Sequence, residues 1–496
     1  MAGLSPWSSW PCLAVGLLAL GGCVVGPRYS RPPAPAPSEF KETPPNWKQA
    51  QPSDQVLRGK WWEVYQDPEL NRLEEKIDVS NQSLKAAKAQ FDEARALVRL
   101  NRADLFPTIN AGVAATRERF SANRPQATSV TTTNDFILPA DMSYEPDVWG
   151  RVRSNVAASR AGAQTSFADL QSVSLSLHAE LATDYFQARE LDAEAQLLDS
   201  TVDSYQRAYE LTESRYQGGV SSQVDVAQAQ TQLETTRAQD IEVKTIRTQF
   251  EHAIAVLIGV PASEFTMQFA PLTASPPATP PGLPSQLLER RPDVAGSERQ
   301  MAAANANIGV TRAAYFPLFS IPATAGFEST RISNWLTGPS GFAAVGVAAT
   351  VTALDFGRRR AANDQAWTAY YQAEANYQQT VLTAYQEVED QLAALHLGSQ
   401  EAQTQAAAVA AAERSLALSQ NRYKGGVTSY LEVTTAQEAA LSNERTAVQL
   451  AGRLMIDSVL LIKALGGGFD AASLSNLDIN APIPHSPAQS TSLNSR

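Results

Sequence analysis

The sequence predicts a mixed, mainly α-helical fold with an internal two-fold repeat, in which four β-strands accompany two long helical hairpins. The first observation is a twelve-residue stretch that occurs twice, at 215–226 and 422–433, with seven identical positions and an offset of 207 residues. The second is that no proline lies between 147 and 260 or between 340 and 481, the two regions that hold these copies. The third is a pair of apolar segments before each proline-free region. Because each copy is one structural unit, the repeat decides how the whole fold is interpreted.

Residues 1–22 are predicted to be a signal peptide. The apolar segment from Leu13 to Leu20 has the length of a signal-peptide core and is too short to span a membrane. Leu20-Gly21-Gly22-Cys23 resembles the bacterial lipobox, so Cys23 is expected to carry a covalent lipid, and no other cofactor is expected. The alternative is a plain secretory signal with an incidental cysteine. Residues 1–22 contain no Lys or Arg, so the usual basic start of a signal peptide is missing.

The segment 23–104 is expected to contain the lipidated spacer and the first helix. Residues 24–57 are rich in proline and polar residues, a composition that favours an extended spacer over a packed core. Helical periodicity then continues through Leu73 and Leu84 towards Leu105.

Two β-hairpins are predicted, at 105–150 and 315–357. Each begins with a Phe-Pro pair and ends with an aromatic residue followed by Gly-Arg, at offsets of 207 to 210 residues. The four expected strands are Ile109–Phe120, Phe136–Trp149, Leu318–Phe327 and Phe342–Phe356. Taken alone, the first hairpin also fits an irregular surface loop, and the second copy is what favours strands.

Three of the four expected strands exceed the roughly 9–11 residues that a strand needs to cross a bilayer, and the fourth, Leu318–Phe327, falls within that range. No apolar run approaches the roughly 18–20 residues of a transmembrane helix, so a membrane span must be made of strands. Four strands cannot close a transmembrane barrel, and an open sheet edge is not viable in lipid. The copies must therefore assemble, and three of them would supply about twelve strands.

Each proline-free region is predicted to form a long helical hairpin, at 151–261 and 358–466. About 66 residues of helix, roughly 100 Å long, precede a paired glycine in each copy. Glycine suits a tight turn between helices because it enters the left-handed region without a Cβ penalty. The predicted turn glycines are Gly218, Gly219, Gly425 and Gly426.

The remaining segments connect and finish the two halves. Residues 262–314 are expected to be a Pro-rich linker followed by the entry helix of the second half. Residues 467–496 are expected to be a C-terminal segment that ends in a polar tail.

Composition excludes several classes of function. A net charge of −11 argues against a nucleic-acid partner, which would require a clustered basic face. Both cysteines, Cys12 and Cys23, precede the body of the chain, so no disulfide framework is expected there. The four histidines lack metal-ligand spacing, and no metal site is expected. No nucleophile–base pairing or phosphate loop appears, so no catalytic residues are expected and the chain is not predicted to be an enzyme.

Several motifs together resemble the outer membrane factors of tripartite multidrug efflux systems, of the lipid-anchored type. They are the lipobox at Cys23, Trp61-Trp62 with Asp67-Pro68, Arg290-Arg291-Pro292-Asp293-Val294, the paired Phe-Pro strand entries and the paired Gly-Gly turns. The resemblance implies a homotrimer with a twelve-stranded β-barrel in the outer membrane and an α-helical barrel crossing the periplasm. It also implies an equatorial domain, a periplasmic adaptor protein and an inner-membrane efflux transporter as partners, and a passive exit duct as the function.

In that family the turns lie at the periplasmic tip, where the helices converge to close the duct. Carried over by position, the resemblance implies that a gate at this tip is formed by Tyr216, Asp225, Tyr423, Leu431 and Glu432. For the two carboxylates the alternative is a helix N-terminal residue that complements the macrodipole. For Tyr423 and Leu431 the alternative is ordinary packing between helices.

One position departs from the family pattern. Related proteins often carry an acidic residue where this chain has Thr435, so an acidic constriction would have to come from Asp225 or Glu432. Two other functions stay open. One is an export duct for polypeptides or metal ions, and the other is a structural coiled-coil lipoprotein that spans the periplasm.

Overall fold

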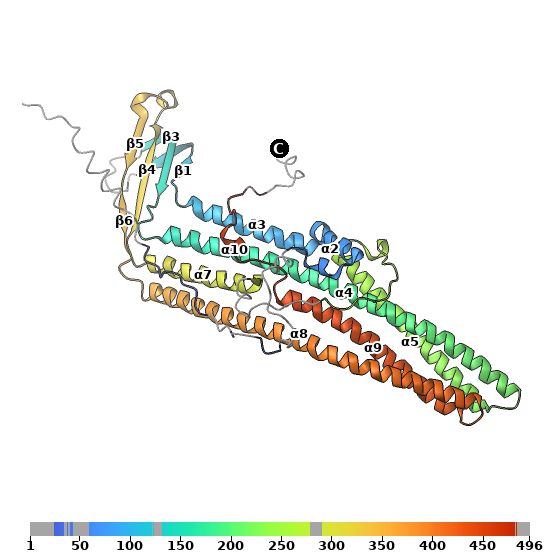
Figure 1. Ribbon diagram of the computed structural model, residues 1–496. Helices are drawn as coiled ribbons and strands as arrows, with labels where there is room; N and C mark the ends of the chain where they lie inside the picture. Colours follow the sequence, from blue (N-terminus) through green and yellow to red (C-terminus); the bar gives the residue numbers. More distant parts are fainter. Residues whose placement is uncertain are drawn as a thin grey trace, which may run out of the picture.

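A computed structural model describes residues 24–33, 37, 40–42, 59–121, 123, 131–277, 290–481 and 483. A β-sheet stands at one end of an elongated helical body, and the two longest helices run from it to the opposite end (Figure 1). Elements of the two sequence halves lie side by side along the whole body. None of the described helices is both long and apolar enough to cross a membrane.

The sheet has four antiparallel lanes, the two outer ones each broken into two short strands. The central lanes are β3 (Thr131–Tyr144) and β4 (Leu318–Ser329), which pair with each other from Phe136↔Ser329 to Tyr144↔Ile321. The outer strands are β1 (Thr108–Ala111) and β2 (Ala114–Phe120) against β3, and β5 (Gly341–Val345) and β6 (Ala348–Thr350) against β4. Short 3-10 turns, η5 (Ile332–Asn334) and η6 (Gly338–Ser340), lie in the β4–β5 connection.

The predicted strand boundaries are wrong at three places. β3 begins at Thr131, inside the expected polar loop, and ends at Tyr144 rather than Trp149. The last lane ends at Thr350 rather than Phe356. Trp149 instead stacks on Phe316 at a ring-centroid distance of 4.6 Å, and its indole N–H donates to the carbonyl of Pro317. The aromatic residues Trp149 and Phe356 thus lie at the junctions between sheet and helix, not at the strand ends.

Two pairs of long helices make up the helical body. α4 (Arg151–Gln217) and α8 (Arg358–Lys424) each have 67 residues, which corresponds to about 100 Å. α5 (Gln223–Leu257) and α9 (Tyr430–Ala464) return alongside them with 35 residues each. Leu191 and Leu198 on α4 are buried against Val243 of α5 and Leu441 of α9, so this apolar seam packs both hairpins together.

The entry helices pack beside α4 and α8 near the sheet. The periodicity around Leu73 and Leu84 belongs to two helices rather than the one expected, α2 (Pro68–Ser80) and α3 (Gln82–Ala103). Asn81 separates them: its backbone is extended, its Oδ1 accepts from the N–H of Leu84, and its Nδ2 donates to the carbonyl of Leu257. The second half has one such helix, α7 (Pro292–Ala313).

Two large cores stabilise the helical body, and the larger one joins the two halves. The larger joins the 3-10 helix η2 (Trp61–Tyr65) and α2 to the middle of α4 and the ends of α5 and α9. The second joins α7, α8 and the end of α9. Shorter elements cover their margins, namely η3 (Ala262–Glu264) and the C-terminal α10 (Ala472–Ser475).

The N-terminal segment after Cys23 is packed against helices, although its composition predicts a free extended spacer. We call its described residues, 24–33, 37 and 40–42, the strap. The carbonyl of Pro27 accepts from Asn305 of α7, and Arg31 donates to the hydroxyl of Tyr377 of α8 at 3.0 Å. Phe40 is buried in the second core. The described residues of the strap form no helix or strand, and their docking against α7 and α8 is not what the Pro-rich composition predicts.

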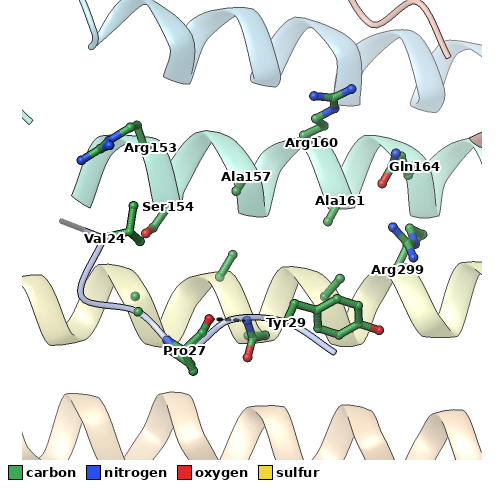
Figure 2. A pocket seen from close by; sticks show the side chains of 15 residues that line it. Val24, Pro27, Tyr29, Arg153, Ser154, Ala157, Arg160, Ala161, Gln164 and Arg299 are labelled. Atoms are coloured by element: carbon green, nitrogen blue, oxygen red, sulfur yellow. Dashed lines mark hydrogen bonds between the residues drawn. The ribbon is translucent and has the colours of Figure 1, made fainter. Parts of the chain in front are cut away.

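Figure 2 shows the strap crossing α7. A cavity of about 470 Å³ lies between the strap, α4 and α7. Three arginines line it, and two of them are paired, Arg153 with Asp147 and Arg299 with Glu298. At the start of the strap, Val24 packs against Gly150, beside the sheet. Cys23 itself lies outside the described residues, so its lipidation stays a prediction.

Candidate functional site: the two glycine turns

The two glycine turns lie together at the end of the body opposite the sheet (Figure 1). Each long helix ends at the first glycine, Gly218 or Gly425, which keeps φ at −76°. The second glycine takes a positive φ, 73° at Gly219 and 75° at Gly426. A left-handed residue at this point satisfies the last carbonyls of the helix, as in a Schellman-type ending.

Asp225 caps the helix that follows the first turn. Its N–H donates to Ser222 Oγ at 3.1 Å, and its Oδ2 accepts from the N–H of Ser222 at 3.0 Å, a capping box. Ser221 Oγ donates to the same oxygen at 2.8 Å. Burial works to raise the pKa of Asp225, but hydrogen bonds from Ser222, Ser221 and the Tyr430 backbone outweigh it and lower the pKa. The carboxylate is therefore ionised and caps the N-terminus of α5. A role for it in a gate stays a prediction.

Glu432 occupies the equivalent position after the second turn but does not make a capping box. Ser429, at the N-cap, makes no side-chain capping bond. The Glu432 carboxylate instead lies 3.3 Å from Arg422, and both side chains are about half exposed. The longer Glu432 side chain thus places its charge at the surface of the turn. The Asp225 carboxylate instead faces the N–H and hydroxyl groups of its own turn.

Three side chains join the first turn to the second. Ser221 Oγ lies 3.2 Å from the hydroxyl of Tyr423, and the guanidinium of Arg215 lies 4.9 Å from the Tyr423 ring centroid. Tyr423 also packs edge-on against Tyr430 at 5.2 Å, and both are buried. Burial raises the pKa of Tyr430 to about 12, so its hydroxyl stays protonated.

The surface of the turns is apolar. The exposed large hydrophobic residues here are Tyr216, Val220, Val224, Val427 and Leu431. Of the predicted gate residues, Tyr216 and Leu431 are thus on the surface, while Tyr423 is packed between helices. Thr435 is exposed, and its hydroxyl donates to the carbonyl of Leu431 within the helix. A gate between copies is not tested by the described chain and stays a prediction.

Arg215 and Arg422 are functional candidates that the sequence reasoning missed. Each is the first residue of one copy of the repeated stretch, and this shared position could have identified both arginines. Their partners differ: Arg215 contacts Tyr423 across the turns, whereas Arg422 pairs with Glu432 in its own turn. Identity between repeats does not reveal that difference.

A second polar cluster is buried where α2 meets α4. His178 Nδ1 lies 2.7 Å from Glu74 Oε2, its Nε2 lies 3.3 Å from Asp78, and its ring stacks on Trp62. Burial raises the pKa of Glu74 to about 7, against the opposing effect of His178. In the part of the chain that the structure describes, no group of three or more His, Cys, Asp or Glu side chains is arranged to hold a metal ion.

The chain is similar to known proteins over most of its length. The model of the outer membrane efflux protein family matches residues 74–260 and 283–467. A Pseudomonas putida protein named probable efflux pump outer membrane protein TtgC is 32% identical over 460 residues, 92% of this chain and 95% of its own. A Salmonella typhimurium protein named probable outer membrane lipoprotein SilC is 28% identical, over 91% and 97%.

Solved structures agree in fold. The outer-membrane channel OprN matches with a TM-score of 0.85 and 28% identity, covering 90% of this chain and 99% of that one. CusC, whose structures concern folding and transmembrane channel formation, matches with a TM-score of 0.80 and 26% identity, over 90% and 100%.

Proposed function

The chain belongs to the outer membrane efflux protein family, and from that premise we propose that it is the exit duct of a tripartite efflux pump. It is an outer membrane transport protein and not an enzyme. In the proposed arrangement an inner-membrane transporter supplies the energy. A periplasmic adaptor connects that transporter to the duct, which conducts passively.

The observation that carries the proposal is a sheet with two open edges above a helical body about 100 Å long. Within the described residues, β1 and β2 pair only with β3, and β5 and β6 only with β4. Backbone N–H and C=O groups on the outer edges need partners in lipid. Three copies would join these edges into a closed barrel of about twelve strands.

The same threefold arrangement gives the helices a role. α4, α5, α8 and α9 from three copies would enclose a tube, and the glycine turns would form its far end. The exposed apolar residues at the turns, Val220, Val224, Val427 and Leu431, then provide a surface for contacts with other copies or with the adaptor.

Relatives suggest the class of cargo. Similar proteins from Pseudomonas putida are named for efflux of antibiotics, toluene and solvents. We propose small toxic organic compounds as the cargo of this duct, with selection made by the transporter because a passive duct imposes little choice.

Conductance in planar bilayers tests the duct and its gate together. Purified protein should give small, mostly closed conductance. Asp225→Asn with Glu432→Gln should raise the conductance, because it weakens the contact of Asp225 with the second turn and removes the Arg422–Glu432 pair within that turn.

The matched control is Glu234→Gln with Glu401→Gln, which removes two exposed, arginine-paired carboxylates away from the turns. It should conduct like the unmodified protein. An unchanged closed state in the test variant would reject Asp225 and Glu432 as gate residues. Absence of any conductance from the unmodified protein would reject the duct.

A further inference from the structure

The four helices that abut the sheet are strongly basic at their sheet-facing ends. The last ten residues of α3 and α7 and the first ten of α4 and α8 contain ten arginines, no lysine and one carboxylate, Asp364. The whole chain, by contrast, has a net charge of −11. The arginines are Arg95, Arg99, Arg102, Arg151, Arg153, Arg160, Arg312, Arg358, Arg359 and Arg360. With the flanking carboxylates Asp104, Glu145, Asp147 and Asp355 included, this end still has ten arginines against five carboxylates.

Carboxylates account for half of these arginines. The ion pairs are Arg95–Asp92, Arg151–Glu145, Arg153–Asp147, Arg359–Asp355 and Arg360–Asp364. The other five arginines make no ion pair with a described residue: Arg99, Arg102, Arg160, Arg312 and Arg358. Figure 2 shows Arg160 extending from α4 away from the strap. Arg160 and Arg358 are both exposed, so their charges are accessible to a ligand from outside the chain.

Aromatic side chains occupy the same level. Phe356 is 92% exposed and Phe106 is 64% exposed, both between a strand and a helix. The guanidinium of Arg312 lies 5.5 Å from the Trp367 ring centroid, and that of Arg359 lies 5.6 Å from Tyr315. Aromatic residues beside cationic side chains are typical of the headgroup level of a membrane.

We infer that this arginine belt binds the phosphate headgroups of anionic phospholipid in the leaflet that faces the helical body. The inference rests on the proposed function, because it requires the sheet to lie in a membrane. The exclusive use of arginine supports phosphate as the ligand, since a planar guanidinium pairs bidentately with phosphate oxygens whereas an ammonium acts as a point charge. Bound headgroups compensate Arg160 and Arg358, which are exposed and lack a carboxylate partner, and they fix the depth of the sheet in the bilayer.

Native mass spectrometry of the purified full-length protein in neutral detergent tests this inference. The probes are phosphatidylglycerol and phosphatidylcholine with the same acyl chains. The unmodified protein should retain phosphatidylglycerol preferentially. Arg160→Gln with Arg358→Gln should weaken that retention about tenfold, because each arginine contributes to attraction by an anionic surface. Phosphatidylcholine retention should not change.

The matched control is Arg207→Gln with Arg414→Gln, which also removes one exposed arginine from α4 and one from α8, far from the sheet. It should keep the preference for phosphatidylglycerol. Equal retention of the two lipids by the unmodified protein would overturn the inference, as would displacement of the lipid by inorganic phosphate alone. A test variant that keeps its lipid but dissociates more readily would instead place these arginines at contacts between copies, and would overturn it too.

Bilayer conductance separates this result from the proposed function. A test variant that conducts normally and loses only the lipid preference supports the belt. An unmodified protein that does not conduct rejects the duct, whatever lipids it retains.

Discussion

Single glycines determine the geometry of the turns. Gly219 and Gly426 have φ near +75° and open space where a Cβ would lie, whereas Gly218 and Gly425 have φ of −76°. Replacing Gly219 or Gly426 with Ala should cost about 1–2 kcal/mol, because an L side chain disfavours the left-handed region. Thermal unfolding in detergent measures the loss.

The neighbouring glycines are the control for this prediction. Gly218→Ala and Gly425→Ala keep an allowed backbone, with only ordinary contacts of 3.4 Å or more around the new Cβ. They should change stability by less than about 1 kcal/mol. Equal losses at both positions of a pair would show that space, not backbone conformation, requires the glycines.

Glu74 should make stability depend on pH. Burial raises its folded pKa from 4.5 to about 7, so its contribution to stability is fully present below pH 4.5 and is lost as the pH rises to about 7. In Glu74→Gln the unfolding temperature should fall less over this range than in the unmodified protein. Glu75→Gln, at an exposed neighbour paired with Lys60, should keep the original slope. Parallel slopes for all three proteins would contradict the assignment.

At this scale the sequence predicts backbone requirements better than side-chain partners. The turn glycines were identifiable because only glycine fits a left-handed turn residue between two helices. The partners of Arg215 and Arg422 were not, since identical residues in the two copies make different contacts. A pairing of this kind depends on the distance between turns, which no local pattern encodes.

At the scale of elements, the glycines that end the returning helices admit another segment's backbone. A Cβ on Gly466 would lie 2.0 Å from the carbonyl oxygen of Arg290, and one on Gly259 would lie 2.5 Å from that of Ser80. Both glycines also have positive φ. The ends of α9 and α5 thus pack in the same way against the entry segments of the two halves.

Gly466→Ala should therefore destabilise the protein more than Gly426→Ala does. Both substitutions carry the left-handed penalty of about 1–2 kcal/mol. Only Gly466→Ala also displaces a packed backbone, which adds about 1–3 kcal/mol. Denaturant unfolding in detergent compares the two variants, and losses of the same size would contradict the role given to this contact.

Long periodic elements were predictable and their interruptions were not. α4 and α8 lie within a residue or two of the expected segments, because no proline and few glycines interrupt them. The break at Asn81 went unseen because the apolar spacing continues across it. The outer lanes of the sheet break at Gly112–Val113 and Gly346–Val347, where alternation of side chains carries no clear signal. Docking of the strap depends on a groove between helices that sequence pattern does not describe.

For the whole molecule, three features of the described chain would be satisfied by the proposed assembly. Its sheet has two open edges, five arginines at the sheet-facing helix ends have no carboxylate partner among the described residues, and apolar side chains are exposed at the turns. The repeat predicted the first of these features, since two hairpins cannot close a barrel. The arginine belt was hidden by the overall negative charge, because composition averages over both ends of a long molecule.

In the proposed assembly three copies of this chain form one duct, and native mass spectrometry of the mature protein in detergent counts the copies. The spectrum should show a complex of three chains that dissociates into single chains on heating. A single chain or a pair as the largest stable species would contradict it, because neither brings enough strands together to close the sheet.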